Sequence, residues 1–240
     1  YINDDILAGC LPYLTYISIF SYGLSPDGGL IYADDERLLR YAAEYGVKAI
    51  LVLTSLTESG TFSSENVSAF LESYEAQTRF IENIIPLLKQ KGYYGVDIDF
   101  EFIPPQYSEV FADFIGRLAD ELNAEGMILF TALAPKISAD QPGLLYEGHN
   151  YRLLGEASNY VLVMTYEWGY TYGPPMAVAP INSVRRVLDY AITEIDPQKI
   201  FMGIPNYGYV WTLPFVQGES KATSISNYEA VDLAAEFGSE

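Results

Sequence analysis

The 240-residue chain carries 32 acidic and 13 basic side chains, and its formal charge of −19 argues against nucleic acids and anionic membrane surfaces as partners. Half of its residues are hydrophobic, which excludes a disordered chain, yet no apolar run approaches the ~18 residues that cross a bilayer. Cys10 and His149 are the only residues of their types, so we expect neither an intrachain disulfide nor a transition-metal site, and predict structural roles for both.

Six short apolar segments alternate with helical patterns along the chain. The segments are 13–20, 47–56, 94–100, 127–135, 160–166 and 199–207, and the helical patterns are 34–46, 63–92, 106–126 and 181–195. The apolar segments lack clean polar alternation, which is typical of strands covered on both faces. Ser63 predicts a helix start, and Gly46, Gly92 and Gly126 predict helix ends. No linker or low-complexity tract divides the chain, so we predict one domain over residues 1–240.

The ends of the predicted strands distinguish two kinds of parallel sheet. A doubly wound nucleotide-binding sheet needs a Gly-rich turn after its first strand, and "SYGLSPDGGL" (21–30) lacks the GxGxxG spacing. Polar residues instead follow nearly every strand: Ser21, Tyr22, Thr54, Ser55, Asp99, Glu101, Lys136, Tyr166, Glu167, Asn206 and Tyr207. Side chains from many strand ends converge at the mouth of a barrel. We therefore predict an α/β fold, a (β/α)₈ TIM barrel.

The stretch "GYYGVDIDFEFIPP" (92–105) places carboxylates at every second position of a predicted strand. Asp97, Asp99 and Glu101 then share one face, starting about 6.6 Å apart. At an effective dielectric constant near 20, two such charges repel by roughly 2.5 kcal/mol, so at least one proton is retained near neutral pH. A retained carboxyl proton is what general acid catalysis requires.

Several interpretations of the three acids remain open at this point. They could be solvated on an edge strand, or they could bind Mg²⁺ or Ca²⁺. If they cleave glycosidic bonds, the opposite face of the sugar needs a second group, supplied either by Glu167 or by the substrate's own 2-acetamido oxygen. The second route needs an acid (Glu101), a carboxylate that orients the acetamide (Asp99) and a tyrosine donor.

Four segments resemble the motifs of glycoside hydrolase family 18, the chitinases and their relatives. "YYGVDIDFE" (93–101) resembles the DxxDxDxE signature, and "MTYEWG" (164–169) the MTYD motif; "GIPNYGYVW" (203–211) and "TALAPKIS" (131–138) resemble the seventh and fifth strands. The closest resemblance is to the bacterial spore-germination branch. This implies an enzyme acting on cortex peptidoglycan or N-acetylglucosamine oligosaccharides, without a cofactor or metal, at the cell wall or spore and outside the cytoplasm.

The resemblance also implies residue roles. Glu101 is the proton donor, Asp99 assists the acetamide, Asp97 holds Asp99, and Tyr166 donates to the acetamide oxygen during oxazolinium formation. The sequence departs from the family pattern twice, with Tyr94 in place of the first Asp of the signature and Glu167 in place of the MTYD Asp.

The resemblance bears on the chain ends as well. If the six segments are strands two to seven, we expect the first strand to lie mostly before Tyr1 and the eighth beyond Glu240. The chain begins without a positively charged leader, so we also expect a mature or excised segment.

Further residues are candidates for binding sugar. Aromatic rings stack on the apolar faces of sugars, and we predict this role for Trp168 and Trp211. Tyr22, Tyr207, Asn206 and Glu167 at strand ends complete the predicted binding set. Lys136 could bind a substrate carboxylate or pair with a neighbouring acid, and we favour the second role. A rigid loop, "YGPPMAVAP" (172–180), is expected over the cleft.

Taken together, these features predict a retaining, substrate-assisted β-N-acetylglucosaminidase that cleaves β-1,4 linkages in spore-cortex peptidoglycan. The alternatives are a chitinase or chito-oligosaccharide hydrolase, and a noncatalytic sugar-binding coat or wall protein on the same barrel. The sequence gives no indication of the oligomeric state.

Overall fold

A parallel sheet forms the centre of the computed structural model, which describes residues 3–57 and 59–238. Its strands are β1 (Tyr16–Leu24), β3 (Lys48–Thr54), β4 (Gly95–Asp99), β5 (Ile128–Leu133), β6 (Tyr160–Val163) and β7 (Ile200–Met202). They lie side by side in chain order, and the short strand β2 (Leu30–Ile31) joins β1 antiparallel at one edge. The carboxyl ends of the six parallel strands therefore meet on one side of the sheet.

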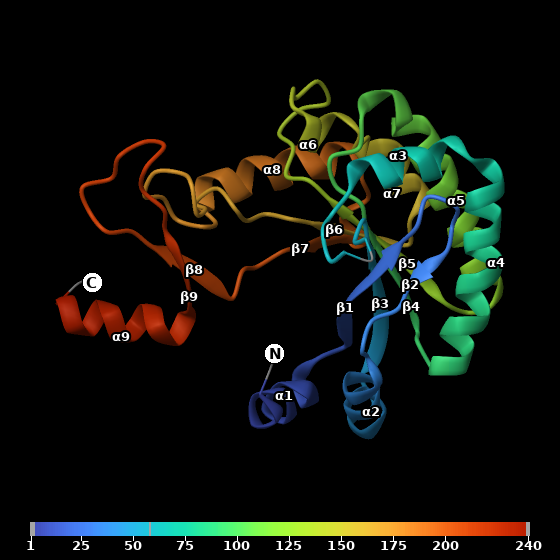
Figure 1. The fold of residues 1–240 in the computed structure, drawn as a ribbon, viewed down its shortest axis with the longest axis horizontal. Coiled ribbons are helices and arrows are strands. Elements are labelled where there is room, and N and C mark those ends of the chain that lie inside the picture. The colour runs from blue at the N-terminus through green and yellow to red at the C-terminus, as the bar shows by residue number, and fades with distance from the viewer. Residues whose placement is uncertain (1–2, 58, 239–240) are drawn as a thin grey trace.

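Most of the helices pack against the outer face of the sheet (Figure 1). The helices are α1 (Asp4–Cys10), α2 (Glu36–Tyr45), α3 (Ser64–Glu72), α4 (Tyr74–Lys91), α5 (Ser108–Ala124), α6 (Leu144–Glu147), α7 (Tyr151–Ala157), α8 (Ile181–Glu194) and α9 (Asn227–Phe237). Helices α2, α3, α4, α5, α7 and α8 pack against the outer face, whereas α9 lies away from it beside the hairpin of β8 (Tyr207–Val210) and β9 (Thr223–Ser226). Single 3₁₀ turns span Leu11–Tyr13, Pro105–Tyr107 and Pro197–Lys199. Within the described ranges, no helix has both the length and the apolar composition needed to span a bilayer.

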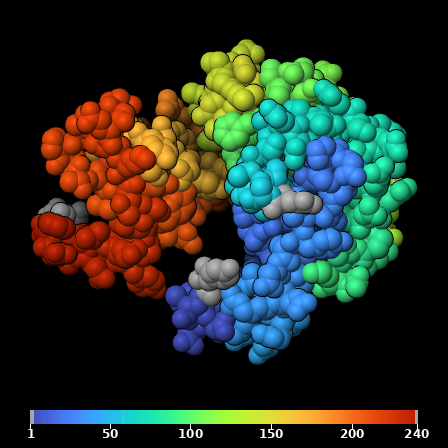
Figure 2. Space-filling view, viewed as in Figure 1, coloured from blue at the N-terminus to red at the C-terminus, as the bar shows by residue number. Residues whose placement is uncertain are grey.

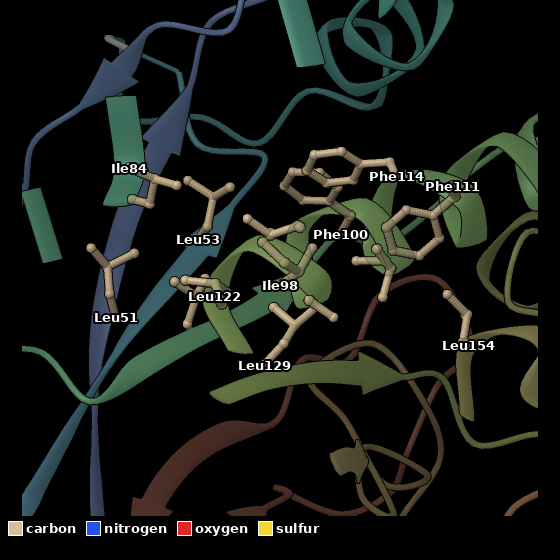
Figure 3. Packing of buried hydrophobic residues seen from close by; sticks show 14 of the residues in the cluster. Leu51, Leu53, Ile84, Ile98, Phe100, Phe111, Phe114, Leu122, Leu129 and Leu154 are labelled. Atoms are coloured by element: carbon tan, nitrogen blue, oxygen red, sulfur yellow. The ribbon is translucent and has the colours of Figure 1, made fainter. Parts of the chain in front are cut away.

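The main core lies between the sheet and helices α2, α3, α4, α5, α7 and α8 (Figure 3). Ile98 and Phe100, from β4 and the residue after it, are completely buried and point toward the side chains of α5. Aromatic rings pack edge to face there, with the ring centroids of Phe70 and Phe114 5.0 Å apart. Each such ring contributes roughly 1.5–3 kcal/mol through burial. This packing fixes one face of β4 against the helices, and the other face of β4 lies on the inner side of the curled sheet.

The sheet curls like part of a barrel, which confirms the predicted fold class. Among the described residues, β7 pairs with β6 alone, so the sheet does not close onto β1. Figure 2 shows the corresponding opening between the C-terminal segments in red and the N-terminal segments in blue. A hairpin of β8 (Tyr207–Val210) and β9 (Thr223–Ser226), followed by α9, projects from the end of β7 (Figure 1).

Most predicted elements are present, with three differences. The helical pattern 63–92 is two helices, because Ser73 has extended backbone angles and caps α4 by accepting a hydrogen bond from the backbone N–H of Ala76. The first strand begins at Tyr16 and continues to Leu24, beyond the predicted end at residue 20. The predicted strand 199–207 ends at Met202, and Tyr207 already belongs to the hairpin.

Candidate active site

Strand β4 separates acidic from apolar side chains, as its alternation predicts. Val96 and Ile98 are completely buried in the core beneath the helices, whereas Asp97, 5% exposed, belongs to the opposite face. Asp99 and Glu101 follow at alternate positions and are half-buried. Because β4 lies between β3 and β5 in the middle of the sheet, the interpretation of these residues as solvated acids on an edge strand is wrong.

Burial is the main cause of the raised pKa values of these acids. It raises the pKa of Asp97 to about 7. It also raises the pKa of Asp99 to about 8, with smaller contributions from the charges of Asp97 and Glu101. The pKa of Glu101 is raised first by burial and then by the charge of Glu167. The expected proton retention therefore stands, but crowding within the trio is only a secondary cause.

Two carboxyl oxygens of the ladder lack internal partners. Oδ1 of Asp97 and Oδ1 of Asp99 are buried, and no described residue donates a hydrogen bond to either atom. A buried, unpaired carboxylate is costly, so this environment favours the neutral acid. Within residues 3–57 and 59–238, no three His, Cys, Asp or Glu side chains are arranged as a metal-binding group.

A cavity of about 170 Å³ opens beside Glu101. Its walls come from the ends of β4, β5 and β6 and from α6: Glu101, Pro135, Leu145, Tyr146, Met164, Tyr166, Glu167 and Trp168. One carboxyl group with a raised pKa, a second carboxyl group, two tyrosines and an indole thus surround one small space. A larger cavity of about 380 Å³ lies near α7 and α8, but none of the three acids of the ladder lines it.

Tyr166 faces this cavity with its hydroxyl protonated. Burial, followed by the charges of Asp99 and Glu101, raises its pKa to about 12. The ring fits because residue 203 is glycine: a Cβ atom there would lie 2.6 Å from Cε1 of Tyr166. Thr165 fixes the neighbouring backbone by donating from Oγ1 to the carbonyl oxygen of Gly203 at 2.7 Å. The phenol is therefore a fixed hydrogen-bond donor at the edge of the acidic ladder.

Glu167 lies next to Tyr166 in a left-handed backbone conformation, with φ of 67°. Tyr209 donates to its Oε1 at 2.9 Å and to its Oε2 at 3.2 Å, and Tyr207 donates to Oε1 as well. Tyr207, predicted to bind sugar, is thus engaged with a carboxylate that lines the cavity.

The predicted aromatic and amide contacts divide between the cavity and the hairpin. Trp168 is half-buried and lines the cavity with Glu101. Trp211 lies beyond β8, where Nε1 donates to the carbonyl oxygen of Gly173 at 2.9 Å, and it does not line the cavity. Asn206 is exposed between β7 and β8 and does not line it either. Of these three residues, the structure brings only Trp168 together with the acids.

The prediction that Tyr22 contacts substrate is wrong. Strand β1 gains one residue relative to β3 between Ile19 and Tyr22, so the side chain of Tyr22 turns to the helix-covered face that also holds Leu53. The ring is completely buried, and its hydroxyl donates to Asp35 at 2.5 Å.

His149 and Lys136 tie strand ends together. His149 is completely buried; its Nδ1 accepts from the backbone N–H of Ala134, and its Nε2 donates to the carbonyl oxygen of Phe100, both at 2.9 Å. The predicted structural role of His149 is confirmed. Lys136 donates from Nζ to the carbonyl oxygen of His149 at 3.0 Å, so its direct partner is a backbone group instead of the expected acid.

Sequence reasoning missed two contributors to the site. Tyr209 lies two residues after Tyr207 in β8, and residues at this spacing in a strand point to the same face, which could have indicated that the two tyrosines act together. Tyr146 comes from α6, a four-residue helix in the loop after β5, and no periodic pattern marks it.

These observations first define a class. A curled parallel sheet that holds a carboxyl group with a raised pKa beside a second carboxyl group, in a cavity at the carboxyl ends of its strands, is the arrangement of a barrel-type glycoside hydrolase. The family itself follows from comparison with known proteins. The chain belongs to glycosyl hydrolases family 18, whose family model matches residues 7–236.

Within this family, the chain is similar to bacterial enzymes that are named for lysis of the spore cortex. The cortical fragment-lytic enzyme of Bacillus subtilis (strain 168) is 38% identical over 223 residues, which cover 93% of this chain and 52% of that protein. The Bacillus cereus spore cortex-lytic enzyme SleL superposes with a TM-score of 0.92 at 34% identity, covering 99% of this chain and 55% of that chain. A chitinase from Chromobacterium violaceum ATCC 12472 has a TM-score of 0.89 at 21% identity, covering 98% and 74%, which shows the shared fold. The chain spans about half the length of the curated relatives it matches.

Proposed function

We propose that this chain carries the catalytic machinery of a retaining, substrate-assisted β-N-acetylglucosaminidase that hydrolyses β-1,4 linkages in spore-cortex peptidoglycan. Spore association outside the cytoplasm is part of the proposal. The cortex-lytic names of relatives at 34–38% identity support the substrate. One observation carries the proposal: Glu101, a carboxyl group whose pKa is raised by burial, lines a cavity together with Tyr166 and follows Asp99, whose pKa is raised to about 8.

The residues fit a two-step reaction. In the first step, the acetamide oxygen of the bound sugar attacks C1, the bond from C1 to the leaving oxygen breaks, and Glu101 gives its proton to that oxygen. Asp99 accepts a hydrogen bond from the acetamide N–H, and Tyr166 donates to the acetamide oxygen. In the second step, water attacks C1 of the oxazolinium ion and returns a proton to Glu101, so the configuration at C1 is retained.

The environment of Glu167 favours this route over a protein nucleophile. Its oxygens accept hydrogen bonds from Tyr207 and Tyr209, which hold lone pairs that an attacking carboxylate would need. The role of second group therefore falls to the substrate acetamide. Asp97 precedes Asp99 by two residues on the same face of β4, and we assign it the role of holding the Asp99 side chain in place.

Replacing Glu101 with Gln tests the proton donor. We expect hydrolysis of a chromogenic N-acetylglucosaminide to fall by roughly 10²–10⁴-fold, because the amide cannot protonate the leaving oxygen. Glu125→Gln alters an exposed acid just after α5, which pairs with Lys89 and does not line the cavity; it serves as the matched control and should keep full activity. Equal turnover by the chain and by Glu101→Gln contradicts the assignment, and absence of turnover by the chain itself favours a sugar-binding function.

The pH profile tests the same assignment independently. Glu101 is active when protonated, and its raised pKa extends activity toward neutral pH. We expect kcat/KM to fall on the alkaline side as this proton is lost, and a flat profile through pH 8 would contradict the role.

The substrate requires a separate measurement. Muramic-acid-containing cortex fragments and chitin oligomers of matched length should be compared by mass spectrometry of the products. We expect faster release from the cortex fragments, and faster cleavage of chitin oligomers would assign the chain to the chitinase alternative.

A further inference from the structure

The side chain of Glu167 is held by two tyrosines from a segment outside the central sheet. Tyr207 and Tyr209 stand at alternate positions of β8, so both rings lie on the same face of the hairpin, with centroids 6.0 Å apart. Tyr209 bridges both carboxylate oxygens and Tyr207 bonds one of them. Hydrogen bonds to a charged acceptor are the stronger kind, so the two hydroxyl groups fix where this negative charge lies.

The backbone at Glu167 is constrained from a second direction. A positive φ is unusual for a residue with a side chain and persists where the surroundings determine it. Here the next two residues pair with the loop that returns from the cleft: Trp168 donates its N–H to Val178, and Gly169 to Ala177, both at 3.1 Å. A Cβ atom on Gly169 would lie 2.1 Å from the carbonyl oxygen of Met176, so this close pairing requires glycine.

The fixed carboxylate shares a cavity with the proposed proton donor. Glu101 and Glu167 both line it, and none of its lining residues is basic. The other titratable groups around Glu101 and Glu167 are Asp97 and Asp99 from β4, Tyr166 after β6, Tyr146 from α6, and Tyr207 and Tyr209 from β8. All are acids or phenols. A negative charge held at the cavity wall therefore acts on Glu101 with no cation in the lining to cancel it.

We propose that Tyr209 and Tyr207 are positioning residues that hold the Glu167 carboxylate at the wall of the cavity, where its charge keeps the proton on Glu101. This inference rests on the proposed function for its catalytic meaning. Without the two hydroxyl groups, the exposed side chain of Glu167 is free to turn toward solvent, where water screens its charge. The hairpin thus contributes to catalysis through Glu167 without touching the reacting atoms.

The direction of the effect follows from the charge. Burial raises the pKa of Glu101 most, and the negative charge of Glu167 raises it further. Removing that charge in Glu167→Gln lowers the pKa of Glu101 by about one unit, and loosening it in Tyr209→Phe lowers the pKa by roughly half a unit. The alkaline limb of kcat/KM moves down by the same amounts. A hydroxyl with a merely structural role would change stability and leave this limb in place.

The test is a ¹³C NMR titration of the Glu101 carboxyl group, assigned by the signal that disappears in Glu101→Gln. The proteins are the full chain, Tyr209→Phe, Glu167→Gln and the double variant, with Tyr228→Phe on α9, 79% exposed, as the matched control. We expect both single variants to lower the pKa, the control to leave it unchanged, and the double variant to match Glu167→Gln, because Tyr209 acts through Glu167.

Each outcome is informative. An unchanged pKa in Tyr209→Phe, or a further shift when this substitution is added to Glu167→Gln, overturns the inference. If Tyr209→Phe does not fold, Tyr207→Phe removes the other donor and tests the same prediction. The titration needs no turnover. If the pKa of Glu101 shifts as expected in a chain that does not hydrolyse the substrate, the proposed function is contradicted and the positioning role stands. If the chain hydrolyses the substrate but the pKa does not shift, the positioning role is contradicted and the proposed function stands.

Discussion

Asp35 and Asp97 are both buried carboxyl groups, and they differ in what surrounds them. Asp35, 0% exposed, accepts hydrogen bonds from Tyr22 at 2.5 Å, Tyr93 at 2.7 Å and Lys91 at 2.6 Å. Burial is the largest single influence and would raise its pKa, but the three donors together outweigh it and lower the pKa. This acid is an ionised, fully satisfied part of the core.

Asp97, by contrast, has a buried oxygen with no donor, and burial raises its pKa to about 7. The neighbouring Asp99 shares this condition. Donors, not depth, thus decide whether a buried acid stabilises the fold or remains available to a ligand. An acid left unsatisfied inside an otherwise well-packed sheet costs stability, and such costs are typical of functional sites.

The largest change in stability is expected when Lys91, the cation that pairs with the buried Asp35 carboxylate, is replaced. Lys91→Met should lower the free energy of unfolding by about 3 kcal/mol at pH 7, because it leaves the Asp35 carboxylate buried without its countercharge. Lys89→Met is the matched control: Lys89 pairs with Glu125 at the surface, and its loss should cost at most about 1 kcal/mol. Urea denaturation followed by circular dichroism measures both, and equal losses would contradict the distinction.

The second prediction concerns Asp97, which lacks a hydrogen-bond donor, and here the substitution is expected to raise the free energy of unfolding. The unfolded pKa of Asp97 is near 3.9 and its folded pKa about 7, so between these values the folded state binds more protons. Asp97 therefore makes the chain less stable as pH rises through this window. Asp97→Asn removes the dependence, and we expect it to be more stable than the parent chain by about 2 kcal/mol at pH 8.

Thermal unfolding at pH 4 and pH 8 checks this sign. Most of the gain in Asp97→Asn should be lost at pH 4, where the acid is protonated in the folded state and close to its titration midpoint in the unfolded state. Asp35→Asn should instead lose stability at pH 8, because the stability from a lowered pKa is present above the unfolded pKa and lost as pH falls. Parallel pH curves for the two variants would mean that the two acids do not differ.

The contrast between these acids was only partly predictable from sequence. The alternation of Asp97, Asp99 and Glu101 predicted their common face, because side-chain direction in a strand is a local property. The dominance of burial over mutual repulsion was not predictable, since it depends on the strands and helices that pack around β4. The same limit applies to the donors of Asp35, which come from positions 22, 91 and 93.

The errors at the site have equally specific causes. Tyr22 was assigned to the cleft because it follows the first apolar segment, and one extra residue in β1 turns it to the other face. Trp211 was placed just past a strand that in fact ends at Met202, with a hairpin strand between them. A register shift and an inserted hairpin leave no periodic signal, so strand ends are where sequence patterns are least reliable.

The smallest expected changes in stability come from replacing a tyrosine with phenylalanine, either at the satisfied Asp35 site or at the cavity. Tyr93→Phe removes a donor from ionised Asp35 and should lower the free energy of unfolding by about 1.5 kcal/mol, with hydrolysis unchanged. Tyr166→Phe removes a hydroxyl that faces the cavity, and should change stability by less than about 0.5 kcal/mol while reducing kcat roughly 10²-fold. Denaturation and kinetics on both variants measure this reciprocal pattern. If Tyr166→Phe destabilised the chain as much as Tyr93→Phe and left kcat intact, the Tyr166 hydroxyl would have a structural role, like the hydroxyl of Tyr93, and no role in catalysis.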